Sequence, residues 1–147
     1  MAISCIQAGK ELCRLSGGTL TQLKMQKILY YAHMIHLGRT SDPLIKNDFL
    51  AWKHGPVALG LYDYVKEHKA DDIPLDAFAI ISDLDRGSEE FKSLDEAYGK
   101  LKELTAGQLV TASHSRGGAW DKTTRMGKVE MRNDLIKEEY DVCSIIK

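Results

Sequence analysis

Apolar residues recur every three or four positions along most of the chain, which is the spacing of helices that bury one face. Several of these stretches follow a residue that can cap a helix N-terminus: Ser4, Thr21, Ser88 and Thr105. The pattern predicts helices over about 5–15, 23–38, 56–69, 89–104 and 106–113, with a final helix after 132–134. We therefore expect a mainly α fold of about six or seven helices.

The second predicted helix is apolar nearly all round. Positions 28–32 read Ile-Leu-Tyr-Tyr-Ala, and the apolar pattern continues to Leu37. A helix without a polar face is typical of a buried position. We expect this helix to lie at the centre of the fold.

The segments between the predicted helices contain candidates for strands, turns and linkers. Residues 42–52 alternate loosely between apolar and polar side chains, which is typical of extended chain or a short strand. Gly55-Pro56 is then predicted to restart a helix, because proline fits the first helical position. Residues 71–85 are predicted to form a linker with room for one short strand at 78–81.

The end of the chain is predicted to form the last helix. The run Arg132-Asn133-Asp134 offers a cap, and Cys143 falls on the apolar face that follows. The complete prediction is a single helical domain over 1–147 with a small extended or short-strand element.

Composition and charge agree with a packed globular chain. Its 147 residues are 44% apolar and 28% charged, and the net charge is −1. A chain without excess positive charge does not attract phosphate backbones, so nucleic acid is not the expected partner. No apolar run is long enough for a membrane span, and residues 1–10 lack a signal-peptide pattern, so we expect a cytoplasmic protein away from the membrane. The three cysteines are interpreted as reduced thiols.

Candidate metal and catalytic groups are few. His33 and His36 have a spacing that could place two imidazoles on one metal, but no cysteine or carboxylate completes a ligand set. A cysteine nucleophile would need an adjacent histidine such as His114, yet the cysteines fall on apolar helix faces. The chain also lacks a phosphate-binding loop and a serine elbow. We expect no metal, no cofactor and no enzymatic activity.

Two clusters are candidates for binding. Trp52, His54 and Tyr62 surround the Gly55-Pro56 turn, where they either lock a loop onto the core or form a contact surface.

The second cluster is basic and lies around Trp120. It contains Arg116, Lys122, Arg125, Lys128 and Arg132. Two interpretations are open: a solvated surface loop, or a patch for an acidic partner. Aromatic and arginine side chains are enriched at interface centres, so we expect a binding surface that joins the two clusters. Its candidate residues are Trp52, His54, Tyr62, His114, Arg116, Trp120 and Arg125.

The order of these motifs resembles the Panacea domain, also called the SocA-like antitoxin domain. The resemblance runs from about Thr19 to Tyr140 and includes the segments Leu20–Tyr31 and Ala51–Val57. The characteristic family positions fall on Lys27, Tyr30, Trp52, Gly55, Pro56, Tyr62, His114 and Trp120. The chain departs from the family pattern at His54, where an aromatic residue is usual.

The resemblance implies a function that composition and spacing do not. It implies a mostly helical bacterial or phage antitoxin domain, without established catalysis, that neutralises a cognate protein toxin by direct contact. The SocA-like branch further implies an adaptor that delivers the toxin to an ATP-dependent protease. The alternative is a small cytosolic enzyme or a nucleic-acid-binding regulator.

Overall fold

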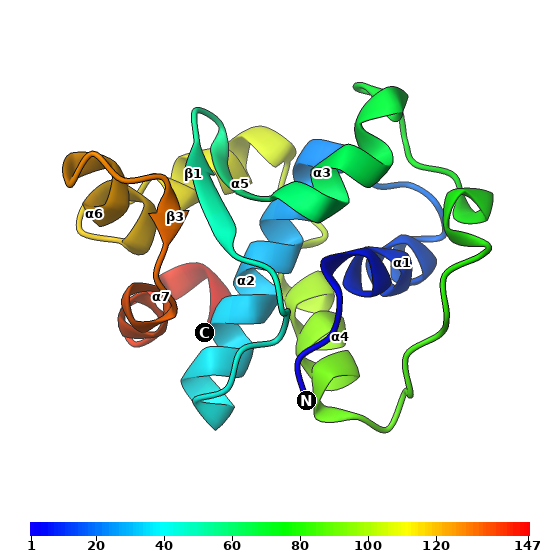
Figure 1. Ribbon diagram of the computed structural model, residues 1–147, viewed down its shortest axis with the longest axis horizontal. Coiled ribbons are helices and arrows are strands. Elements are labelled where there is room, and N and C mark those ends of the chain that lie inside the picture. The colour runs from blue at the N-terminus through cyan, green and yellow to red at the C-terminus, as the bar shows by residue number, and fades with distance from the viewer.

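Seven α-helices and a small antiparallel sheet make up the computed structural model, which describes residues 1–147 (Figure 1). The helices are α1 (Cys5–Ser16), α2 (Gln22–Thr40), α3 (Leu59–Val65), α4 (Glu89–Leu101), α5 (Ala106–Ser113), α6 (Ala119–Arg125) and α7 (Asn133–Tyr140). Short 3-10 helices span Lys66–His68, Leu75–Phe78 and Ser144–Ile146. The predicted mainly α fold with a small strand element is confirmed.

The central element is α2, with α1 and α3 on one side and α6 and α7 on the other in Figure 1. Every residue from Met25 to Leu37 is buried, and α2 contacts α1, α3, α4, α5, α7 and the sheet. The predicted central position of this helix is confirmed. Because it has no solvent-facing side over this length, each polar residue on it needs a partner inside the protein.

The predicted helix caps are confirmed at four N-termini. The side chains of Ser4, Thr21 and Ser88 each accept a hydrogen bond from a backbone N–H in the first turn of their helix. Thr105 forms a complete capping box with Gln108 at the start of α5. These local bonds fix where α1, α2, α4 and α5 begin.

The final helix differs from its prediction. α7 already includes Asn133 and Asp134, and its N-cap residue, Arg132, makes no side-chain capping bond. The Oδ1 of Asn133 lies 2.9 Å from Nε2 of His33 on α2, so its side chain is used across the molecule rather than as a cap. Cys143 lies beyond the end of α7, in the turn before the last 3-10 helix.

The sheet consists of β1 (Phe49–Trp52), β2 (Gly55–Ala58) and β3 (Glu130–Met131) in the order β2-β1-β3. Both pairings are antiparallel, and β1 and β2 form a hairpin whose register pairs Trp52 with Gly55. The strand predicted within 42–52 is confirmed at its C-terminal end.

The helix predicted from Pro56 to about Lys69 is wrong in its first part. Residues Gly55–Ala58 form β2, and α3 begins only at Leu59. Gly55 has a φ of +102°, which reverses the chain into the hairpin instead of starting a helix. Pro56 is tolerated because β2 is an edge strand.

The segment 71–85 contains no strand at 78–81. Its backbone makes successive local turns, in which the N–H groups of Ala77, Ala79 and Ile81 donate to carbonyls three residues earlier. Two buried side chains anchor the segment: Ile73, whose N–H donates to the Leu20 carbonyl, and Phe78, which stacks on Tyr64.

Candidate functional site

The outer edge of β2 is closed by two side chains of α2. Gln26 donates from Nε2 to the Ala58 carbonyl at 3.0 Å and accepts the Ala58 N–H at 2.9 Å. Lys27 donates from Nζ to the Pro56 carbonyl at 2.8 Å. In an antiparallel hairpin, alternate residues direct their backbone groups away from the partner strand. Pro56 and Ala58 are these residues in β2, so this edge offers no free hydrogen-bonding groups to a further strand.

Lys27 is fully buried beneath the hairpin. Removal from water penalises the ammonium form, which lowers the pKa of Lys27 to about 7. A Cβ on Gly55 would lie 2.7 Å from Lys27 Cε and 2.6 Å from Ser113 Oγ. Glycine is therefore required at position 55 both by its positive φ and by the close approach of α2 and α5.

Aromatic residues continue from the hairpin to α6. The His114 ring stacks on Trp120 with centroids 3.8 Å apart and an interplanar angle of 20°. The Trp120 indole N–H donates to the Trp52 carbonyl at 2.8 Å, and the Trp52 ring meets Tyr62 edge to face at 5.0 Å. The structure thus brings both candidate clusters together at these four residues.

His114 lies near the buried ammonium of this region. Burial lowers the pKa of His114, and the charges of Lys27 and His54 lower it further. Its Nε2 is buried and has no hydrogen-bond partner. Lys27, Gly55 and His114 are far apart in sequence but share one environment under the hairpin.

The arginines of the candidate set lie at the exposed end of this region. Arg116 is exposed and forms no ion pair, whereas Arg125 pairs with Asp121 at 3.0 Å on the same helix. Elsewhere in the basic cluster, Lys122 pairs with Glu138 at 3.3 Å and Arg132 pairs with its neighbour Asp134. Much of the positive charge counted in the sequence is therefore already matched by carboxylates.

An apolar pocket of about 390 Å³ opens beside the hairpin. Trp52, His54 and Tyr62 line it. Leu23 of α2 and Val57 of β2 also line it, although they were not among the candidate binding residues predicted from the sequence. The missed residues have ordinary apolar character, and only the packing of α2 against the hairpin places them together. His114, Arg116, Trp120 and Arg125 do not line this pocket.

A second buried polar contact joins α2 to the C-terminal helices. Glu139 Oε1 accepts the Ala119 N–H at 2.8 Å and the Tyr30 hydroxyl at 3.2 Å. Burial raises the pKa of Glu139. Sequence reasoning selected Tyr30 but missed Glu139, because a glutamate on α7 resembles its exposed neighbours until the fold buries it.

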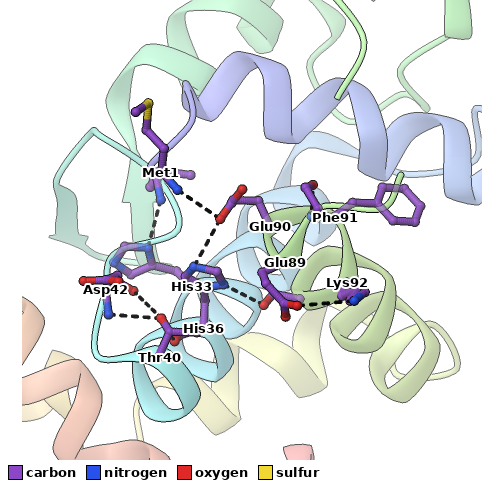
Figure 2. Close-up of polar contacts among 12 residues, drawn as sticks. Met1, His33, His36, Thr40, Asp42, Glu89, Glu90, Phe91 and Lys92 are labelled. Carbon is purple, nitrogen blue, oxygen red and sulfur yellow. Dashed lines mark hydrogen bonds and ion pairs between the residues drawn. The ribbon is translucent and has the colours of Figure 1, made fainter. Parts of the chain in front are cut away.

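His33 and His36 have hydrogen-bonding partners within the protein. His33 Nε2 lies 2.9 Å from Asn133 Oδ1, and His36 Nδ1 lies 2.8 Å from Ser93 Oγ. Figure 2 shows His36 beside Glu90, whose carboxylate is 3.7 Å from His36 Nε2. Burial lowers the pKa of His33 to about 4. These contacts tie α2 to α4 and α7, and no three candidate ligands gather around the two rings.

Comparison with known proteins identifies the class. Residues 25–121 match the family described as antitoxin SocA-like, Panacea domain. This segment runs from α2 into α6 and contains the hairpin, the buried lysine and the aromatic residues described above. The chain belongs to this family, and the predicted resemblance is confirmed.

A particular relative is antitoxin SocA of Caulobacter vibrioides (strain NA1000 / CB15N). The chain is 30% identical to it over 110 residues, which cover 69% of this chain and 58% of SocA. The aligned part therefore spans little more than half of that relative's length. No solved structure matches the chain. None of the helices has the length and apolar character needed to cross a membrane.

Proposed function

We propose that this protein is an antitoxin that neutralises a cognate protein toxin by binding it directly. The observation that carries the proposal is the family match over 25–121. That segment contains the hairpin and the three residues that meet beneath it: Lys27, Gly55 and His114. The 30% identity to a protein named antitoxin SocA supports the same function.

The proposed contact surface extends from the hairpin to α6. Trp52, Tyr62 and Trp120 are only half-buried, and they are held in place by one another. Rigid aromatic side chains lose little conformational freedom on binding, which suits them as anchors. His54 and Arg116 are exposed beside them and can contact a partner without disturbing the core.

Co-expression with the product of the adjacent gene tests the function. We expect that protein to co-purify with the chain and to lose its toxicity. Failure of both retention and rescue by a folded chain would contradict the proposal. Rescue without retention would instead favour the alternative of an enzyme or a nucleic-acid-binding regulator.

Arginine variants test the location of the surface. We expect Arg116→Ala to weaken toxin binding by about 2 kcal/mol, close to thirtyfold, with an unchanged melting temperature. Arg125→Ala should lose less, because Asp121 already pairs with that side chain. Arg86→Ala, on the exposed linker before α4, is the matched control. Equal binding by all three variants and the parent would place the surface elsewhere.

We further propose that the antitoxin neutralises the toxin by delivering it to an ATP-dependent protease. An adaptor shortens the lifetime of the toxin, whereas a sequestering antitoxin leaves the toxin intact in a complex. We therefore expect a shorter toxin half-life in cells when the antitoxin is present. A toxin half-life unchanged by the antitoxin, with full rescue of growth, would support sequestration instead.

A further inference from the structure

Contacts within the protein hold the walls of the pocket beside the hairpin. Trp52 is held through its carbonyl by the Trp120 indole and through its ring by Tyr62. On the opposite side, Gln22 Nε2 donates to the Lys69 carbonyl at 2.6 Å and links α2 to the turn after α3. A pocket with preformed walls does not pay the cost of ordering them when a ligand binds.

The deep part of the pocket offers few polar groups to a ligand. The Gln26 amide already uses its oxygen and one of its two N–H groups on Ala58. The remaining inner surface comes from Leu23, Trp52, Val57 and Tyr62. A polar metabolite would lose its water without gaining matching hydrogen bonds, whereas an apolar group would gain from burial.

The charged residues that line the pocket are positive. Lys53 and Lys69 line it, neither ammonium group has a carboxylate partner, and no Asp or Glu lines the pocket. Lys66 stands over the Tyr62 ring at 6.0 Å and pairs with Asp63. The charge in the lining is therefore cationic, although the protein as a whole has a net charge of −1.

We propose that this pocket receives a large apolar side chain of the toxin that is flanked by Asp or Glu in the toxin sequence. The inference rests on the proposed antitoxin function and specifies the chemistry of its partner. The volume of about 390 Å³ lies at the small end of ligand pockets, which suits one aromatic side chain and its neighbours. The flanking carboxylates pair with Lys53 and Lys69.

Filling the pocket tests the apolar part of the proposal. Ala70 is exposed and lines the pocket, so Ala70→Trp places an indole in the opening without entering the core. We expect binding of the co-purified toxin to weaken at least tenfold, with a melting temperature equal to that of the parent. Ala79→Trp, exposed on the linker away from the pocket, is the matched control and should bind normally.

Charge reversal tests the acidic part. The double variant Lys53→Glu/Lys69→Glu should bind at least tenfold more weakly, and the loss should shrink as salt is raised. Lys46→Glu, exposed and outside the pocket, changes charge without changing binding. Normal binding by the double variant would overturn the acidic part of the proposal.

The outcomes separate the two proposals. Normal toxin binding by Ala70→Trp would overturn the pocket proposal and leave the antitoxin function intact. If the parent is a dimer that Ala70→Trp converts to a monomer with full toxin affinity, a second copy occupies the pocket and the proposal is wrong. Absence of any toxin binding by the parent would overturn both.

Discussion

Buried polar residues at the two ends of α2 have different partners. Near its start, Gln26 and Lys27 bind backbone groups of β2, and Lys27 has no carboxylate partner. Near its end, His33 and His36 bind the side chains of Asn133 and Ser93, and His33 also accepts the backbone N–H of Ile45. The first end holds a strand and shapes a pocket, whereas the second joins helices. Of the two ends, only the first buries a lysine, and it does so beneath the hairpin of the candidate site.

The largest loss of stability is expected for Gly55→Ala in the hairpin. The new methyl group would strain the backbone and overlap neighbouring side-chain atoms. The φ of +102° at Gly55 and the approach of Lys27 and Ser113 together predict a loss of about 2–6 kcal/mol in the free energy of unfolding. Gly117→Ala is the matched control, because its φ is +79° but no atom crowds its Cβ position. Equal losses in chemical denaturation would show that crowding by α2 and α5 contributes nothing.

The next effect concerns the charge of Lys27. Burial lowers its pKa from 10.5 to about 7, so between these values the unfolded chain binds more protons than the native chain. The free energy of unfolding should therefore rise with pH over this interval, by about 5 kcal/mol. Lys27→Met removes this contribution, so its denaturation curves should lack the rise. Parallel pH profiles for parent and variant would contradict a buried, deprotonating amine.

Near the other end of α2, His33 should make the free energy of unfolding depend on pH in a different, more acidic range. Burial lowers the pKa of His33 from 6.5 to about 4, so the unfolded chain again binds more protons between these values. The free energy of unfolding falls as the pH falls through this range, by about 3 kcal/mol. His33→Asn should flatten the acid side of the profile and leave the interval above pH 7 unchanged. If His33→Asn changed the stability profile in both pH intervals, the titrations of His33 and Lys27 would be coupled.

The smallest effect is expected where the hairpin meets α6. Trp120→Phe keeps a ring beside His114 but removes the indole donor to the Trp52 carbonyl, at a cost of about 1 kcal/mol. Trp52 would then be less firmly held, so toxin binding should fall by more than the stability loss suggests. Denaturation and binding titrations of the same samples measure both. Unchanged binding would separate Trp120 from the pocket.

Local sequence determined most of the helices. Caps at Ser4, Thr21, Ser88 and Thr105 and the apolar run of α2 depend on residues a few positions apart, so they could be predicted directly. Residues 55–58 could not, because Gly-Pro is compatible with a helix start and with an edge strand. Pairing with β1 and the bonds from α2 decided between them.

The candidate site shows the same division. Its aromatic residues and the Gly55-Pro56 turn were identifiable from residue type and order, which also indicated the family. The roles of Gln26, Glu139 and Leu23 depended on the tertiary structure, because each is an ordinary helical residue until a distant segment packs against it. Burial makes the Gln26 amide the partner of both backbone groups of Ala58, and it lowers the pKa of Lys27. Which residues are buried depends on contacts between segments far apart in the chain.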